Sequence, residues 1–274
     1  MGLRVNTNIA SLTAQRNLGR VTGRLQGNYA RLSSGLRIAS AADDAAGLTT
    51  SERMRSQIRS LGSASRNAQD GISLVQTAEG ALSEVSNILG RMRELAVQAS
   101  NGTLNTDDRA TINIEVLALQ DEIDRVATTS SFNGINLLES ASTVNIQVGI
   151  NGGEVIEVNL PNNQTSSLGI GSDTVGTTTV ASAGASLALL DAAIGSVNSA
   201  RGNLGASQNR LQSAVASILN SRENLSAAES RIRDVDVAFE TADLTRNSIL
   251  QQAATSVLQQ ANTQPQLALS LLQG

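Results

Sequence analysis

The chain of 274 residues contains no cysteine, histidine, tryptophan or lysine, and has only one tyrosine, two phenylalanines and two prolines. Without histidine or cysteine it has no Ser-His relay, no thiolate nucleophile and none of the commonest zinc ligands. Compact enzymes normally fill their cores with large aromatic side chains, which are almost absent here. We therefore expect no enzyme activity, no cofactor and no metal.

The few motifs that could carry acid or metal chemistry are incomplete. Asp43 and Asp44 are adjacent, so on a helix their carboxylates would point about 100° apart rather than into one site. Asp234 and Asp236 begin like a calcium-binding loop, but Phe239 occupies the sixth position, where a glycine is needed. Neither pair is predicted to form a catalytic or metal site.

Membrane and nucleic-acid partners are also not expected. The chain has no run of 18 apolar residues, and its start lacks the apolar core of a cleaved secretory signal. The first 42 residues carry six arginines and no acid, which resembles a nucleic-acid-binding arm. However, no aromatic residues are interleaved for base stacking. An amphipathic helix with acidic partners elsewhere explains the charge better.

Three stretches have the apolar spacing of long packed helices. The strongest runs from 190 to 239, the second from 54 to 96 and the third from 112 to 126. In the first, an apolar residue recurs every seven positions: Leu190, Val197, Leu204, Leu211, Ile218, Leu225, Ile232 and Phe239. Such spacing predicts near-parallel helix packing, and a helix over 190–239 would be roughly 75 Å long. We predict a mainly α fold, an elongated antiparallel helical rod or coiled coil.

Between the helices the pattern changes to one typical of strands. Apolar residues alternate from Val144 to Ile150 and again from Ile156 to Leu160, around a glycine-bearing turn. This predicts a β-hairpin that lies outside the helical pattern, followed by a surface loop over 161–183.

The two ends carry short apolar stripes. Neither stripe can bury its face alone, because short single helices are marginal in water. We therefore expect the ends to pair with each other or with other molecules. The predicted packing residues of the ends and of the long helix are Leu18, Val21, Leu25, Leu32, Leu204, Leu211, Ile218, Leu225, Leu250 and Val257.

Several segments resemble the bacterial flagellins. These are LRVNTNIASLTAQRNL and RLSSGLRIASAADDAAGL near the start, MRELAVQASNGT, and SRIRDVDVAFETADLTRNSILQQAATSVLQQANTQPQLALSLL near the end. The resemblance implies a secreted structural subunit that polymerises into the extracellular filament used for motility. It also implies that subunits leave through the flagellar export channel without a cleaved signal peptide. Implied partners are other copies of the chain, the flagellar cap and hook-junction proteins, and a cytoplasmic export chaperone at the C-terminal segment.

The resemblance also divides the chain into domains. Residues 1–42 with 237–274 would form an inner coiled-coil domain, and 43–140 with 184–236 an outer helical rod. Residues 141–183 would form the hairpin and a Ser/Thr/Gly loop. Two other functions stay open: a hook–filament junction protein, which shares the terminal motifs, and an unrelated extracellular helical adhesin, which would not explain them.

In flagellins that Toll-like receptor 5 senses, a segment like RMRELAVQ and an acid on the next helix form the contact. Arg91, Leu95 and Glu115 match that pattern, whereas Gly90 stands where relatives commonly carry glutamine. The resemblance therefore implies that the monomer activates this receptor, and Gly90 is expected to weaken the activation. The alternative is that Arg91 and Leu95 simply face a neighbouring subunit.

Overall fold

The computed structural model describes the backbone of residues 7–272 and the side chains of residues 7–263. It confirms the prediction of a mainly α fold with a small β-hairpin. The chain forms two compact units: Met1–Ser56 with Asn224–Gly274, which we call the terminal unit, and Gln57–Glu223, which we call the central unit. The predicted domain boundaries after 42 and before 237 follow the loops between helices, and they stay a proposal.

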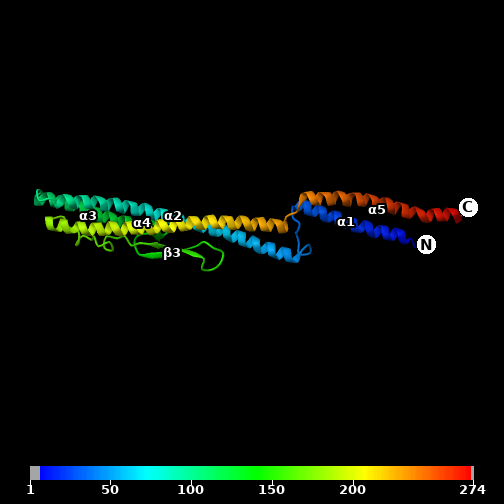
Figure 1. The fold of residues 1–274 in the computed structure, drawn as a ribbon, viewed down its shortest axis with the longest axis horizontal. Helices are drawn as coiled ribbons and strands as arrows, with labels where there is room; N and C mark the ends of the chain where they lie inside the picture. Colours follow the sequence, from blue (N-terminus) through cyan, green and yellow to red (C-terminus); the bar gives the residue numbers. More distant parts are fainter. Residues whose placement is uncertain (1–6, 273–274) are drawn as a thin grey trace. The chain divides into compact units, whose positions relative to one another are not determined.

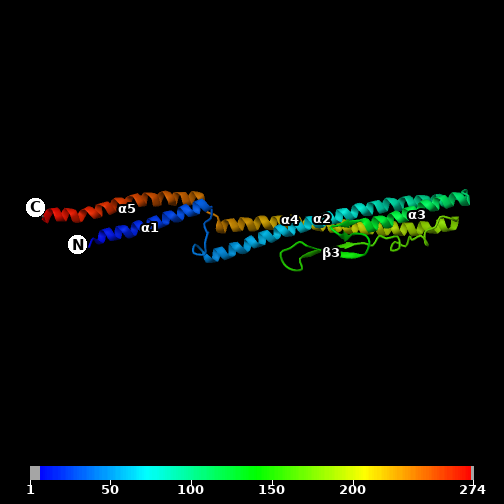
Figure 2. The same cartoon turned by 180° about the vertical axis from the view of Figure 1, so that it is seen from behind.

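The terminal unit contains two antiparallel helices, α1 (Ile9–Ser34) and α5 (Val237–Leu272), which lie side by side in both views of the ribbon (Figures 1 and 2). The start of α1 is capped by Asn8, whose side chain accepts a hydrogen bond from the Ser11 N–H at 3.1 Å. Its end is set by Gly35, which adopts a left-handed φ of 71° that glycine takes without strain.

Beyond α1 the chain meets the segment that leads into α5. Leu36 and Asp234 form an antiparallel bridge, and the Val235 N–H donates to the Gly35 carbonyl at 3.0 Å. The two linking segments are therefore hydrogen-bonded to each other.

The small residues that follow form an ordered turn. The Asp43 carboxylate accepts hydrogen bonds from the N–H groups of Ala39 and Ser40, at 3.2 and 2.9 Å. Asp44 then accepts from the N–H of Gly47 at 2.9 Å, at the start of α2 (Ala45–Ala99). Side-chain caps thus explain why this acid-bearing stretch separates two helices.

The central unit is built on α2, α3 (Thr106–Thr129) and α4 (Val180–Arg233), which lie side by side in Figures 1 and 2. Helix α2 runs antiparallel to α4. Helix α3 begins at Thr106 because Asn105 caps it and forms a capping box with Asp108. Fully buried side chains from the three helices form the centre of the core: Val75, Leu82, Leu89, Met92, Val116, Ile123, Leu190, Val197, Leu204 and Leu211.

The prediction of one helix over 190–239 was wrong at both ends. Helix α4 begins ten residues earlier and ends at Arg233, and α5 begins at Val237. The break arises because the Asp236 carboxylate accepts hydrogen bonds from the N–H groups of Ala238 and Phe239, which caps α5. Phe239 consequently leaves the heptad series and is 66% exposed.

The predicted hairpin is present as β3 (Ser142–Gln147) paired antiparallel with β4 (Val155–Leu160). A second, two-residue ladder of β1 (Ser131–Phe132) and β2 (Ile135–Asn136) was not predicted. The hairpin lies outside the heptad series of the helices, but one face of β4 nevertheless joins the core of the central unit. The core residues of β4 are Ile156, Val158 and Leu160.

The segment after the hairpin is more than a surface loop. The carboxylate of Asp124 on α3 accepts hydrogen bonds from the N–H and the hydroxyl of Thr165, at 2.8 and 2.7 Å. Gln120 on α3 donates to the Ile170 carbonyl at 2.8 Å, and the Ile170 side chain is fully buried. Polar groups on α3 therefore hold this segment in place.

By length and composition alone, α4 is the one helix of the described residues that could cross a membrane. Its heptad positions are instead buried against other parts of the central unit, as at Leu190 and Leu204. The same pattern is typical of a helix in a soluble core.

Candidate assembly and recognition sites

Helices α1 and α5 meet along a narrow line of side chains, which we call the terminal seam. On α1 its buried or half-buried positions alternate in steps of three and four residues: Ser11, Ala14, Leu18, Val21, Leu25, Asn28 and Leu32. This is the spacing of coiled-coil packing. Of the predicted residues on α1, Leu25 is buried at 5% exposure and the other three are half-buried.

On α5 the seam is more polar than the sequence pattern indicated. Its positions are Glu240, Leu244, Asn247, Gln251, Ala254, Leu258 and Ala261. The predicted residues Leu250 and Val257 are 42% and 57% exposed. They are not buried by α1 in the single chain, and their part in packing between subunits stays a prediction.

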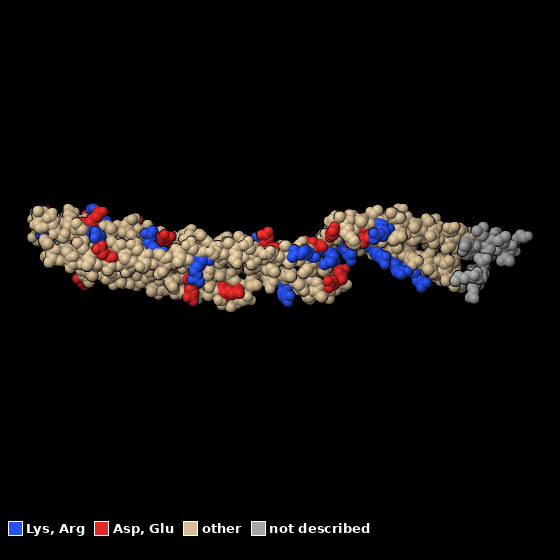
Figure 3. Space-filling view, viewed as in Figure 1, with Lys and Arg blue, Asp and Glu red and all other residues tan. Residues whose placement is uncertain are grey.

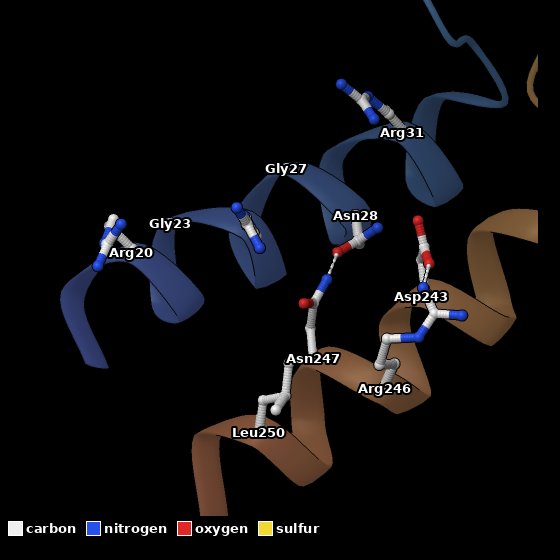
Figure 4. A pocket seen from close by; sticks show the side chains of 10 residues that line it. Arg20, Gly23, Gly27, Asn28, Arg31, Asp243, Arg246, Asn247 and Leu250 are labelled. Atoms are coloured by element: carbon white, nitrogen blue, oxygen red, sulfur yellow. Dashed lines mark hydrogen bonds and ion pairs between the residues drawn. The ribbon is translucent and has the colours of Figure 1, made fainter. Parts of the chain in front are cut away.

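Polar side chains connect α1 and α5 near the joint, by which we mean the hydrogen-bonded linking segments around Leu36 and Asp234 (Figure 4). Asn247 donates to the side-chain oxygen of Asn28 at 2.9 Å. Asn28 in turn donates to the Glu240 carboxylate at 2.6 Å. Glu240 is 5% exposed and also lies 3.7 Å from a guanidinium nitrogen of Arg31. Sequence reasoning missed this network, although Asn28 continues the heptad spacing of Leu25 and could have indicated it.

A groove of about 540 Å³ opens above this network. Arg20, Arg24 and Arg31 line it from α1, and Arg246 lines it from α5 beside Asp243, at 2.7 Å (Figure 4). Figure 3 shows the arginine atoms in blue along the surface formed by α1. The groove is therefore basic, although Asp243 also lines it.

The terminal unit also leaves many large apolar side chains in water. On α1 these include Ile9 and Tyr29, at 65% and 60% exposure. On α5 they include Phe239 and Ile249, at 66% and 60%. Exposed apolar faces on this scale are typical of surfaces that bind other molecules.

The predicted packing residues of α4 become more exposed toward the C-terminal end of the helix. Leu204 and Leu211 are fully buried, Ile218 is 5% exposed, and Leu225 is half-buried. The first two belong to the core of the central unit.

The residues matched to the receptor contact lie on α2 and α3. The Arg91 guanidinium forms an ion pair with Glu115 at 2.9 Å and another with Glu94 at 3.2 Å. The hydrogen bond that Arg91 donates to Glu115 is the main cause that raises the pKa of Arg91. Leu95 is only 2% exposed and packs in the core. A binding protein could therefore touch Arg91 and Glu115, but hardly Leu95. A Cβ added at Gly90 would meet no atom within 4 Å, so a longer side chain fits there.

Among the residues that the structure describes, no three acidic side chains gather as a metal ion would require.

Two family models match the chain and together span most of it. The model of the bacterial flagellin N-terminal helical region matches residues 5–143, and that of the C-terminal helical region matches residues 187–272.

Known proteins of similar length match along nearly the whole chain. The flagellin of Halalkalibacterium halodurans is 48% identical over 98% of this chain and 99% of its own length. The flagellar filament 30.7 kDa core protein of Treponema maltophilum is 44% identical, over 98% of this chain and 99% of its own. Among solved structures, the crystal structure of Bacillus cereus flagellin matches 60% of this chain and 94% of its own, at 35% identity and a TM-score of 0.49.

Proposed function

Because this chain belongs to the bacterial flagellin family and is a structural subunit that polymerises into the extracellular flagellar filament, we propose that its paired ends are the element that drives assembly. In this proposal residues 1–42 and 237–274 form the inner domain and pack against the same segments of other copies. Residues 43–140 and 184–236 form the outer rod, and residues 141–183 form the β-hairpin and the Ser/Thr/Gly segment packed against it.

The exposed apolar residues of the terminal unit carry this proposal. Val237, Phe239 and Ile249 on α5 and Leu12 on α1 are all more than half exposed in the single chain. Burying a large apolar side chain is worth about 1.5–3 kcal/mol, so contacts with neighbouring copies would gain much from these positions. Since every copy is identical, the gain repeats at each added subunit.

The test removes this apolar surface without disturbing the core. The variant Phe239→Ser/Ile249→Ser should keep the helical circular dichroism of the unaltered chain but should form few or no filaments in electron micrographs. Val180→Ser, at a position that is 43% exposed in the central unit, is the control and should polymerise normally. Normal filament yield from the double variant would overturn the proposal.

The same surface suits the implied partners. We propose that a cytoplasmic export chaperone covers the C-terminal segment before assembly, since Ile249 and Val257 are exposed on α5. The same proposal includes contacts with cap and hook-junction proteins. It includes export through the flagellar channel without cleavage of a signal peptide. It also holds that the protein has no catalytic activity and binds neither nucleic acid nor membranes. An intact mass of the filament protein that lacked an N-terminal segment would contradict the export route.

We further propose that the monomer engages Toll-like receptor 5 through Arg91 and Glu115, with Leu95 buried beneath them. Arg91→Ala should weaken activation of receptor-bearing cells, and Gly90→Gln should strengthen it because the site has room for the added side chain. Arg125→Ala is the control, since Arg125 is an exposed arginine in a similar ion pair with Glu122. No response to the monomer at saturating concentrations would refute the proposal.

A further inference from the structure

We propose that polar side chains at the two ends of the terminal seam specify the register in which α1 and α5 pair. This rests on the proposed role of the paired ends in assembly, and it adds what selects one pairing among several. The polar residues near the joint are Asn28, Glu240 and Asn247, and those at the other end are Asn8, Ser11 and Asn262.

The network near the joint is directional and buried. Asn247 donates to Asn28, and Asn28 donates to Glu240, so each group meets a partner of the right kind. All three side chains are less than 10% exposed, with Asn28 at 6% and Asn247 at 9%. A buried amide or carboxylate without such partners would destabilise the pairing, and the buried charge would do so more strongly than the amide.

The far end of the seam carries a second set of hydrogen bonds in the same register. The Ser11 hydroxyl donates to the Asn262 side-chain oxygen at 2.7 Å. The Asn8 amide donates to the Ala261 carbonyl, also at 2.7 Å. The two sets are separated by more than four turns of α1, so both form only when the helices are in one alignment.

The apolar part of the seam does not select a register by itself. Leu18 and Val21 are half-buried, and they face a side of α5 that presents Ala254 and Leu258 at heptad spacing. A slip by seven residues that sets Val21 opposite Leu258 keeps apolar positions opposite one another. The same slip would separate Asn28 from both Glu240 and Asn247 and leave its buried amide without these partners. Discrimination between registers therefore falls on the polar side chains.

Such residues improve specificity more than stability. In coiled coils a single buried asparagine can fix register at a cost in stability, and well-packed apolar replacements are often neutral or stabilising. In a polymer of identical copies, a slipped pair would present the wrong surface to every neighbour.

Register can be measured by cross-linking, because the chain has no cysteine of its own. The aligned reporter is Ala14→Cys/Leu258→Cys, whose positions lie opposite each other when Ser11 meets Asn262. The reporters for slips of seven residues in either direction are Ala14→Cys/Gln251→Cys and Val21→Cys/Leu258→Cys. A short thiol-reactive linker is applied to the full-length chain, both assembled and in solution.

In the otherwise unaltered chain the aligned reporter should cross-link on the order of tenfold or more above either slipped reporter. In Asn28→Leu/Glu240→Leu/Asn247→Leu the slipped products should rise to a similar yield, while thermal stability stays equal or increases. Glu240→Gln, which keeps a hydrogen-bond acceptor, should retain the aligned product, as should the apolar control Leu25→Ile.

Two outcomes distinguish failure of this inference from failure of the proposed assembly by paired ends. If the triple variant, with Ser11→Ala added to break the bond to Asn262, still cross-links only in the aligned register, the polar residues do not set register and the inference is overturned. If the aligned reporter chain forms no filaments, assembly by paired ends fails, whereas the linker still traps those monomers whose ends are transiently paired and reports their register.

Discussion

Asn113 on α3 accepts two hydrogen bonds from Thr177, one from its N–H and one from its hydroxyl, both at 3.1 Å. Thr177 is fully buried. Together with the bonds of Asp124 and Gln120, this contact means that the segment from Thr165 to Thr177 follows α3 and is fixed at three points. A stretch with the composition of a flexible loop thus forms part of the wall of the central unit.

The first prediction tests this attachment. Asp124→Ala removes the acceptor for both groups of Thr165 and should lower the free energy of unfolding by about 1–3 kcal/mol. Proteases should then cut near Thr165 before they cut the helices. Asp121→Ala, on the exposed side of the same helix, should change neither the free energy of unfolding nor the order of proteolytic cleavage. Equal proteolysis of the two variants would show that the attachment is unimportant.

The second prediction tests the core. Leu211→Asp places a charge at a fully buried position and should cost at least about 3 kcal/mol, a large part of the stability of a typical domain. We expect a lower melting temperature and a loss of filaments. Leu219→Asp is the matched control, because Leu219 is 43% exposed on the same helix and should tolerate the change. Wild-type melting of Leu211→Asp would mean that the core is placed wrongly.

The third prediction concerns pH at the turn before α2. The Ser40 N–H and then the Ser40 hydroxyl hold the pKa of Asp43 below its ordinary value of 3.8. A carboxyl group with a lowered folded pKa stabilises the fold above the unfolded pKa, and this contribution is lost as the pH falls through the folded value.

The comparison is therefore between the unaltered chain and Asp43→Asn in thermal melts. The difference in melting temperature should be constant from neutral pH down to about pH 5 and should shrink below about pH 4. A difference that stays constant down to about pH 2 would contradict the assignment.

The fourth prediction concerns the ends of the monomer. The apolar side chains buried along the described part of the terminal seam are Ala14, Leu25 and Ala261, which is little to offset about 1–2 kcal/mol of backbone entropy per residue. In solution trypsin should cut first at Arg20, Arg24 or Arg246 and leave a resistant core. Filaments should protect the same sites, and a monomer whose ends resist as well as its centre would refute this.

The sequence was a good guide where one regular pattern dominated. The apolar repeat of α2 lies within a single helix, and the alternation around Val144 and Val158 lies within one hairpin. Local periodicity reports such elements directly, because burial on one face is what creates it.

The failures came where side-chain hydrogen bonds override the pattern. The heptad passes through Ile232 and Phe239 without a gap, but the cap at Asp236 ends one helix and starts another. The seam of α5 was assigned to Leu250 and Val257, although Asn247 and Gln251 occupy it. Polar residues at packed positions can be recognised only when their partner is known, and here the partner of Asn247 lies 219 positions away.

That separation has a consequence for the timing of folding. Ribosomes add about 5–20 residues per second, so α1 is complete many seconds before Asn247 and Asn262 have been made. Local helices form in about a microsecond, whereas a contact across such a long loop must first overcome its closure entropy. The pairing of α1 with α5 is therefore the last step in the folding of the new chain. Until that step, α1 must be kept from binding other partners.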